Sequence, residues 1–579
     1  MELDCKLKEN EKLIEEVLNN NQGNGDNESD GNEEDKRVQA QILIDLAGEA
    51  ELFHSNDGTG YATIEIGGTR QNWPIKSKEF KNYLVKEFYD LKQRPPGSQA
   101  LQDALNTLEA NASYVGPELP VYKRVARRNE NIYIDLCDSS WGAIEVSSGG
   151  WQIVDHPPVK FIRSKDMLPL CAPERNGSIE ELRGFINIEK ESDWRLIISW
   201  ILAAIRPDGP FPILVLKGEQ GSAKSTVAKV LRELVDPYKA PLRSAPLQER
   251  DLAVAANNSW VLVFDNISRI PPWLSDGLCR VATGGGFAVR TLYTDSEETV
   301  FDYKRPIILN GIDEIVTRHD LLDRCIIINL PVISDEERVD ESTFWVEFNK
   351  AKGRIFGAIL DGAVEGLRNY DRVELETLPR MADFAKWVVA SEAALPWPEG
   401  GFMESYTGNR EEAVDIALDS DCVAVATKQL IDEKDEFEGN ATELLDALKE
   451  HVDEQTYRSK SWPKTARGLS NRVRRSATFL RQKGIEIEHK KTNQKRLFII
   501  RRQNSNENKR HDSHTVTLQE AEGAPEVTET TEVTKETSHN SITSPSEPSQ
   551  YEQCDDGDEG DEGDGEFNPD SEDLTEVKI

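Results

Sequence analysis

The chain has 579 residues and a formal net charge of −36, with 37% hydrophobic and 30% charged residues. This length exceeds what one hydrophobic core serves and indicates three or four structural units. The negative net charge argues against nucleic-acid binding along the whole chain. No apolar run reaches membrane-spanning length, and the scattered cysteines offer no zinc site. The N-terminus lacks the apolar core of a signal peptide. We therefore expect a cytoplasmic protein.

Two segments precede the central motifs. Residues 1–37 predict a helical or disordered N-terminal segment, with a charged helix over 4–20 and then an acidic linker. Residues 38–190 alternate strand and helix patterns and predict a separate α/β domain of unknown role. Within it, Asp135 and Asp138 follow a strand pattern. They are candidates for the metal pair of a priming site, or they cap a turn, as acids at strand ends usually do.

The stretch Phe211–Thr226, FPILVLKGEQGSAKST, carries the strongest motif. A buried strand breaks into a short glycine-containing loop and resumes as a helix, which is the context of a phosphate-binding P-loop. Backbone N–H groups and the helix N-terminus face the phosphates, Lys224 adds charge, and Ser225 is a ligand for Mg²⁺. Ala223 stands where the pattern has glycine. The predicted ATP-binding residues are Gly218, Glu219, Gln220, Gly221, Ser222, Ala223, Lys224, Ser225 and Thr226.

Further motifs follow within residues 191–370. An apolar strand beginning at Trp260 ends in Asp265, as in a Walker B motif whose carboxylate holds Mg²⁺. A helix pattern and a β-hairpin pattern come next. A second buried strand then ends in Asn310, and Arg324 directly precedes another apolar strand.

In this order the motifs resemble the superfamily 3 helicase type of AAA+ ATPase, in particular the phage, plasmid and poxvirus primase-helicase group. The resemblance covers about residues 190–370. It implies a hexameric ring that moves along DNA and hydrolyses ATP with Mg²⁺ at subunit interfaces. It also implies that Asn310 contacts the γ-phosphate or attacking water, and that Arg324 is the arginine finger for the neighbouring subunit, with Arg318 as a second candidate.

Two positions depart from that family's pattern. Asn266 stands where a second acid usually orients or activates water, so hydrolysis is slow or is assisted by another carboxylate such as Glu219. The hairpin tip is acidic (residues 295–298), whereas related helicases present basic residues there to DNA. Basic residues flank the tip at Arg290, Lys304 and Arg305. Of these, Arg290 and Lys304 face either the nucleotide or the channel, or they form structural ion pairs.

The rest of the chain divides into three parts. Residues 371–435 predict a helical connector or lid in which Phe384 and Trp387 belong to the core. Residues 436–502 predict helices followed by a two-stranded wing, and this segment resembles the winged-helix units fused behind such ATPases. Residues 503–579 are rich in acidic and small polar residues and predict a disordered tail, either simply solvated or competing with DNA for the basic segment.

Basic residues gather in the predicted winged helix, within a strongly acidic chain. Phosphates are their natural partner, with the helix offered to the major groove and the wing to the backbone. The alternative is a surface for the acidic tail or for a partner protein. The predicted DNA-binding residues are Arg467, Arg472, Arg474, Arg475, Lys490, Lys491, Lys495 and Arg496.

The sequence as a whole predicts an α/β protein. Its P-loop AAA+ core is a parallel sheet flanked by helices, with an N-terminal α/β domain, a C-terminal winged helix and disordered termini. The leading hypothesis is an ATP-driven DNA helicase or translocase that works as a homo-oligomeric ring in replication of a mobile element or plasmid. The alternatives are a DNA-binding switch with slow hydrolysis, for example in antiviral defence, and a primase-helicase.

Overall fold

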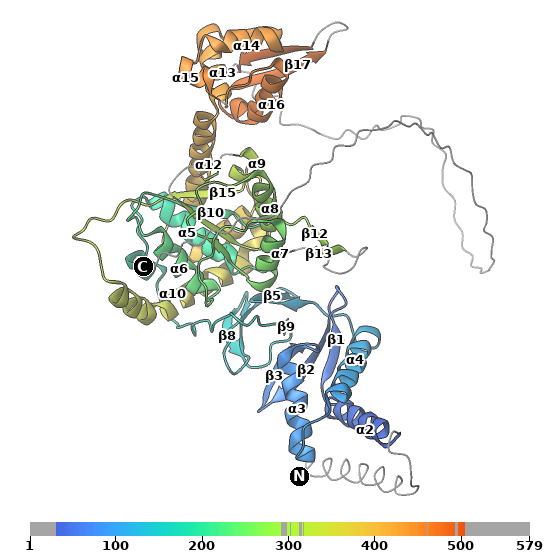
Figure 1. Cartoon of the computed structure of the whole chain (residues 1–579). Coiled ribbons are helices and arrows are strands. Elements are labelled where there is room, and N and C mark those ends of the chain that lie inside the picture. The colour runs from blue at the N-terminus through green and yellow to red at the C-terminus, as the bar shows by residue number, and fades with distance from the viewer. Residues whose placement is uncertain are drawn as a thin grey trace, which may run out of the picture. The chain divides into compact units, whose positions relative to one another are not determined.

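The computed structural model describes residues 30–290, 298–301, 303–311, 315–316, 318–459, 461–491 and 496–503 (Figure 1). The predicted helix over 4–20, residues 295–297 of the hairpin tip, Lys495 and the acidic tail from residue 504 lie outside these residues. None of the described helices is long and apolar enough to cross a membrane.

The N-terminal module is a small antiparallel sheet, in the order β1-β2-β3, packed against helices. Its apolar core includes Leu43, Phe80, Leu84 and Leu105, all nearly inaccessible to solvent. The sequence predicts a linker before residue 38, and this is wrong for its last residues, because α2 already begins at Asp30 and packs along α4. The elements are α2 (Asp30–Leu46), β1 (Glu51–His54), β2 (Gly60–Ile66), β3 (Thr69–Pro74), α3 (Lys78–Lys92) and α4 (Ser98–Tyr114).

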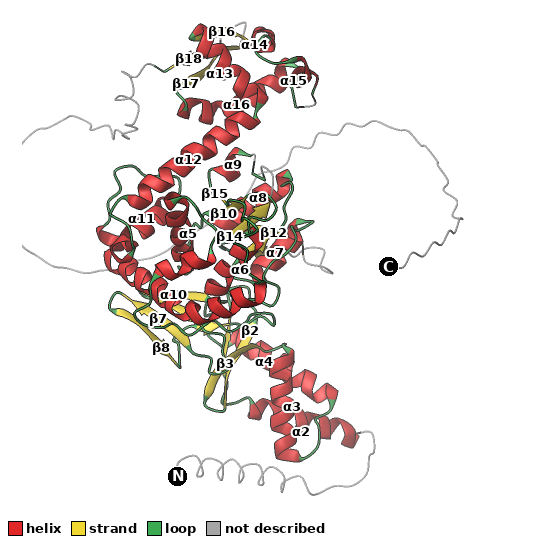
Figure 2. Ribbon diagram, turned by 90° about the vertical axis from the view of Figure 1, so that its left-hand side faces the viewer, coloured by secondary structure: helices red, strands yellow, loops and turns green. Residues whose placement is uncertain are grey.

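A second antiparallel sheet, in the order β5-β6-β7-β8, follows and shares its core with the central region rather than with the first sheet. Its apolar side chains, such as Ile134 and Ile144, pack into that core, and α10 lies across β7 and β8 (Figure 2). Residues 38–190 therefore contain two sheets with different cores, and a third, two-stranded parallel sheet formed by β4 and β9. The elements are β4 (Val121–Tyr122), β5 (Val125–Arg128), β6 (Asn131–Asp135), β7 (Ala143–Ser147), β8 (Gly150–Val154) and β9 (Lys160–Phe161).

The central region is built on a parallel sheet in the order β11-β14-β10-β15. These strands are buried and nearly all apolar, because helices cover the sheet. The predicted hairpin is present as β12 and β13, and Phe384 and Trp387 are buried as predicted. The elements are α5 (Glu191–Ala204), β10 (Ile213–Lys217), α6 (Lys224–Val235), α7 (Glu249–Asn258), β11 (Leu262–Phe264), α8 (Pro272–Thr283), β12 (Phe287–Arg290), β13 (Glu298–Phe301), β14 (Ile307–Gly311), α9 (His319–Leu322), β15 (Cys325–Asn329), α10 (Glu341–Asn369), α11 (Ala382–Ser391) and α12 (Gly401–Ser420).

The C-terminal unit begins at α13, earlier than the predicted boundary at residue 436, since α13 packs on α14 and α16. The Asp421 side chain holds the first turn of α13 against α16. Its carboxylate caps α13 through Val423 N (3.0 Å) and accepts hydrogen bonds from Arg472 Nε (3.1 Å) and Ser476 Oγ (2.7 Å). An antiparallel sheet in the order β16-β18-β17 completes the unit. The elements are α13 (Cys422–Lys434), β16 (Glu436–Asn440), α14 (Ala441–Lys449), α15 (Glu454–Arg458), α16 (Ala466–Gln482), β17 (Ile485–Lys491) and β18 (Arg496–Arg502).

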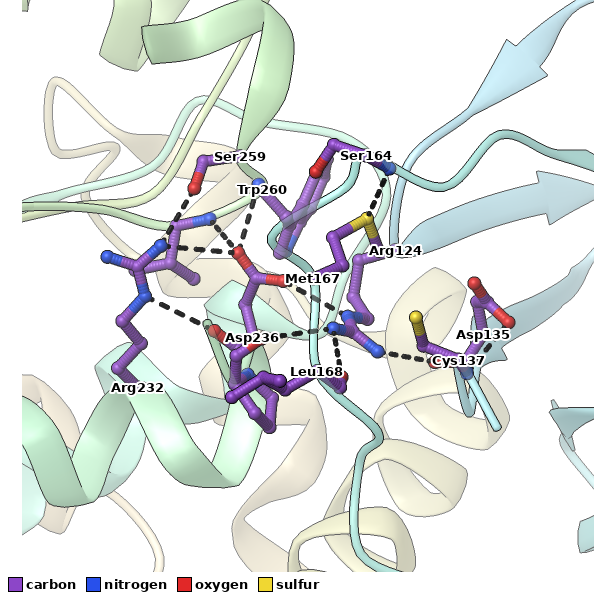
Figure 3. A network of polar contacts seen from close by, with 12 residues as sticks. Arg124, Asp135, Cys137, Ser164, Met167, Leu168, Arg232, Asp236, Ser259 and Trp260 are labelled. Carbon is purple, nitrogen blue, oxygen red and sulfur yellow. Dashed lines mark hydrogen bonds and ion pairs between the residues drawn. The ribbon is translucent and has the colours of Figure 1, made fainter. Parts of the chain in front are cut away.

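A buried ion pair joins the second sheet to the central region (Figure 3). Arg124 Nε lies 3.1 Å from Asp236 Oδ1, and neither side chain is exposed. Arg124 also donates to Asp135 O and Leu168 O, while Asp236 Oδ2 accepts from the backbone N–H groups of Trp260 and Val261 at 3.0 Å each. Burial of these charges is compensated by a complete set of partners, which is the condition for a stable buried pair.

Replacing Asp236 with alanine should lower the free energy of unfolding by about 3–5 kcal/mol, because it leaves the Arg124 charge buried without its partner. Urea denaturation measures this. The matched control is Arg127→Ala, since the Arg127–Asp208 pair is 40% and 60% exposed, and such pairs contribute less than about 1 kcal/mol. Equal effects of the two variants would contradict a special role for the buried pair.

Candidate nucleotide site

The loop between β10 and α6 is shaped by its glycines. Gly218 has φ +156°, and a Cβ there would lie 2.6 Å from Ser222 Oγ and 2.7 Å from Leu330 O. Ser222 Oγ donates to Glu219 O at 2.8 Å and closes the loop on itself. A side chain at position 218 would therefore force the loop open.

Asn187 positions the loop, and sequence reasoning missed it. Its Nδ2 donates to Ser222 O (3.1 Å) and to Pro331 O (2.6 Å), which ties the loop to the segment after β15. No motif marks this residue, because the contact spans 35 positions to the loop and 144 to Pro331.

Ala223 takes the left-handed conformation, with φ +60° and ψ +25°, directly before α6. This conformation costs a residue with a Cβ roughly 1–2 kcal/mol, which explains why glycine is usual at this position. The loop adopts this conformation with alanine in place of the glycine of the motif.

The Lys224 amine is folded back over the loop. Its Nζ donates to Gly218 O (2.7 Å) and Glu219 O (2.6 Å) and lies 3.3 Å from Ser222 Oγ. Partial burial lowers the pKa of Lys224, and the nearby Asp265 carboxylate opposes that shift. The amine thus lies over the loop whose backbone N–H groups would receive phosphate.

Ser225 and Asp265, the predicted metal ligands, meet directly. Ser225 Oγ lies 3.0 Å from Asp265 Oδ1 and 3.3 Å from Oδ2. Ser225 is in the first turn of α6, and Asp265 follows β11 at the carboxyl edge of the sheet. A hydroxyl and a carboxylate together are oxygen ligands that suit Mg²⁺.

Asn310 joins this cluster because β14 lies between β10 and β11. The side chain is buried, and its Oδ1 accepts a hydrogen bond from Asn266 N at 2.8 Å. Its Nδ2 has no hydrogen-bond partner within the part of the chain that the structure describes. A buried amide donor without a partner costs free energy, so this atom is suited to receive a ligand acceptor.

Asn266 is exposed and has φ +55°. Asparagine and aspartate tolerate this left-handed conformation better than other residues with a side chain. The backbone therefore gives a physical reason for asparagine here, where a glutamate would be strained.

Of the two predicted arginine-finger residues, Arg324 lies away from this cluster. Arg324 directly precedes β15, which runs parallel to β10, so it lies at the amino edge of the sheet. Its guanidinium donates to Asp320 O at 2.5 Å, and its Nε has no partner among the described residues. Arg318 is held on α8 by an ion pair with Asp276 (2.9 Å) and a hydrogen bond to Pro272 O (3.0 Å). Arg324, at the opposite edge of the sheet, cannot reach the site of its own chain.

Asp135 and Asp138 have structural roles. Asp135 is fully buried, and its carboxylate is paired with Arg163 at 2.6 Å. Asp138 accepts hydrogen bonds from Ser140 N and Oγ, so its predicted role in capping a turn is confirmed. Across the described ranges, no group of three or more His, Cys, Asp or Glu side chains is placed to hold a metal ion.

Of the basic residues near the hairpin, Arg305 is buried and donates to Ala256 O (2.9 Å) and Ser259 O (3.1 Å). Lys304 is exposed. The side chains of Arg290, Glu298 and Asp302 lie outside the described side chains, so an ion pair between Arg290 and either acid stays a prediction.

The predicted DNA-binding residues separate into two groups. Arg472 is half-buried and paired with Asp421, so it holds the C-terminal unit together rather than facing outward. The side chains of Lys491 and Lys495 are not described. The predicted residues that are exposed, and that form no ion pair within the described chain, are Arg467, Arg474, Arg475, Lys490 and Arg496.

Comparison with protein families matches two adjoining models. Residues 179–406 match the actinomycete integrative conjugative element replication protein, and residues 423–517 match the C-terminal domain of that protein. The chain is similar to conjugative-element replication proteins. The first match contains the loop, Asp265, Asn310 and Arg324, and the second begins within α13, close to the structural boundary at Asp421. No curated protein matches the chain.

Among solved structures, an apo form of the NrS-1 C-terminal region aligns at 11% identity and a TM-score of 0.35, over 81% of this chain and 99% of that one. A second NrS-1 structure aligns at 13% identity and 0.36, with the same coverage. A JCV helicase aligns at 12% identity and 0.21, over 36% of this chain and 67% of that one. At these scores the likeness does not identify a common fold.

Replacing Ala223 with glycine should raise the free energy of unfolding by about 0.5–1 kcal/mol, because relief of the left-handed strain exceeds the added entropy of the unfolded chain. Thermal and urea unfolding measure this. Ala228→Gly, in the helical interior of the same α6, is the control and should lower stability by about 1 kcal/mol or more. A223G destabilising as much as A228G would refute the strain.

Proposed function

We propose that this chain is an ATP-dependent DNA helicase or translocase that acts in replication of a conjugative element. The observation that carries the proposal is the meeting of Ser225, Asp265 and Asn310 beside the Lys224 loop, at the carboxyl edge of one parallel sheet. This edge is where open α/β sheets bind ligands. The family match to replication proteins supports the biological setting.

The residues of the loop would bind ATP through backbone N–H groups and the N-terminus of α6, which has no side-chain cap. Lys224 would exchange its carbonyl partners for phosphate oxygens. Ser225 and Asp265 would hold Mg²⁺, which supplies charge neutralisation between the β- and γ-phosphates. Asn310 Nδ2 would donate to the γ-phosphate or the attacking water. This assignment gives a partner to a buried amide donor that lacks one among the described residues.

Arg324 would act on a neighbouring subunit, because it lies at the edge of the sheet opposite its own loop. This placement requires an assembly in which the amino edge of one subunit faces the carboxyl edge of the next. A closed homo-oligomeric ring satisfies that head-to-tail geometry. We favour Arg324 over Arg318, since Arg318 is already occupied by Asp276.

The C-terminal unit would be a winged helix that contacts DNA. Helix α16 precedes the two strands of the wing, and its exposed arginines, such as Arg474 and Arg475, form no ion pair within the described chain. Thr465 caps α16 by accepting from Gly468 N at 3.1 Å, so the helix start is well defined. Such a helix fits the major groove, while Lys490 and Arg496 on the wing suit phosphates.

A DNA-binding switch with slow hydrolysis is the second candidate. Asn266 favours it, because an amide positions water but is a poor general base. Glu219, the alternative carboxylate, is exposed on the loop. The structure does not support the primase-helicase alternative, because the Asp135 carboxylate forms an ion pair with Arg163.

ATP turnover with and without single-stranded DNA tests the motor. We expect DNA to stimulate turnover, Lys224→Ala to abolish it, and Arg324→Ala to reduce it about 10³-fold. Arg318→Ala is the matched control and should keep most of the activity. Adding R324A protein to the parent protein should reduce turnover more than dilution does, because each variant subunit silences its neighbour's site.

Near-zero turnover that DNA does not stimulate would contradict the motor and favour the switch. In that case Asn266→Asp should increase turnover, because aspartate also tolerates the left-handed backbone and adds a carboxylate beside Asp265.

The paired substitution Arg474→Ala and Arg475→Ala should weaken duplex DNA binding and lower the salt slope of log K by about 1.8, because each arginine that no longer neutralises a phosphate reduces the slope by about 0.9. Fluorescence anisotropy at several salt concentrations measures both. Arg458→Ala is the control, because Arg458 lies in the same unit but pairs with Glu454. An unchanged slope in the paired variant would exclude α16 from the DNA interface.

A further inference from the structure

A cavity of about 790 Å³ lies beside the second sheet, next to the segment that follows the hairpin. Its walls come from the turn between β1 and β2, from the segment 118–125, and from residues 257–260 and 303–305. The volume is in the range of ligand sites. Residues 303–305 link the hairpin to β14, which ends in Asn310 at the opposite edge of the sheet.

Three cations line this cavity: Lys123, Lys304 and Arg305. Lys123 makes no hydrogen bond or ion pair within the described residues, although most of its side chain is covered. Burial lowers the pKa of Lys123 to about 8, and the charge of Arg305 adds to the shift. A covered ammonium group without an acidic partner is unfavourable in the free protein, and an anion from solution would relieve it.

The acids in the cavity wall do not serve as that partner. Asp57 accepts hydrogen bonds from Ser55 Oγ (2.5 Å) and Thr59 N (3.1 Å). Burial raises the pKa of Asp57, but these contacts outweigh it and lower the pKa below its usual value. Glu118 also lines the wall, but no contact joins it to Lys123. The cavity is therefore positive in a chain whose net charge is −36.

The buried network of Figure 3 holds both charged walls in place. Arg124, next to Lys123, is fixed to Asp236, and Asp236 fixes Trp260. Ser259 O accepts from Arg305 Nε at 3.1 Å. Lys123 and Lys304 therefore lie next to backbone that hydrogen bonds already hold in place. This limits the conformational entropy that the protein loses when a ligand binds.

Aromatic rings lie beside these charges. The Arg305 guanidinium lies 4.8 Å from the Tyr303 ring centroid and 5.1 Å from that of Trp260. Tyr303 Oη donates to Asn257 Oδ1 at 2.9 Å, which orients its ring. Cations interleaved with aromatic rings are the combination that binds the phosphates and bases of unpaired nucleotides.

We propose that this cavity binds a phosphate group next to an unpaired base, with Lys123 and Lys304 as the cationic contacts and Tyr303 beside the base. The ligand is a single DNA strand, or a free nucleotide, which offers the same chemistry. The site is distinct from the Lys224 loop and from α16, and it does not require that the chain hydrolyses ATP.

The test uses the full chain with Lys123→Gln and Lys304→Gln, singly. Binding of fluorescein-labelled oligothymidylate is measured by anisotropy over a range of salt. We expect each variant to weaken binding about 5–10-fold and to reduce the salt slope by about 0.7, the value for one contact to a single strand. Lys239→Gln is the control, because Lys239 is exposed and paired with Asp166. It should change affinity less than about 2-fold, as expected for a lysine outside the interface.

Two further arms identify the ligand. ATP binding is measured in the Lys224→Ala background. If K123Q weakens binding of ATP but not of the oligonucleotide, the ligand of the cavity is a free nucleotide. Photo-crosslinking of 5-iodouridine oligonucleotides should label peptides containing residues 118–125 or 303–305. Unchanged binding of both ligands in K123Q and K304Q, or crosslinks confined to residues 436–503, would overturn the proposal. Loss of ATP turnover in K224A leaves these outcomes unaffected, so failure of the motor and failure of this site are distinguishable.

Discussion

The side chain of Asp236 fixes the geometry on which the rest of the structure depends. It follows α6, and its carboxylate binds the N–H groups of Trp260 and Val261 just before β11. The far ends of the same two elements meet where Ser225 lies 3.0 Å from Asp265. A helix and a strand joined at one end by a fully buried carboxylate have little freedom at the other. Arg124 completes the charge balance and brings the second sheet into the same buried network.

The parallel sheet separates the functions of its two edges. The loop, Asp265 and Asn310 lie at the carboxyl edge, and Arg324 and Arg305 lie at the amino edge. On our proposal, each subunit thus carries the main part of one ATP site and contributes Arg324 to another. The strand β14 runs between the edges, from the proposed nucleic-acid cavity beside Arg305 to Asn310. If both proposed sites exist, a small displacement of this strand would affect both, and it would couple DNA binding to nucleotide binding.

The sequence pattern predicted those parts of the structure that depend on neighbouring residues. Apolar runs that are interrupted by glycine and polar residues predicted the strand, loop and helix around Lys224. They also predicted the strands before Asp265 and Asn310. Long-range packing could not be predicted in this way. Arg472 resembles its exposed neighbours in sequence, but Asp421, 51 positions away, engages it. The second sheet packs into the central core, and Lys123 faces a cavity built by residues about 180 positions later.

We propose that the loop, Ser225 and Asp265 form a Mg²⁺-dependent ATP site. Isothermal titration of ATP into the full chain, with Mg²⁺ and with EDTA, measures this dependence. We expect Mg²⁺ to tighten ATP binding in the parent protein, and Asp265→Ala and Ser225→Ala to lose most of this enhancement while the chain stays folded. Equal enhancement by Mg²⁺ in the parent and in both variants would contradict it.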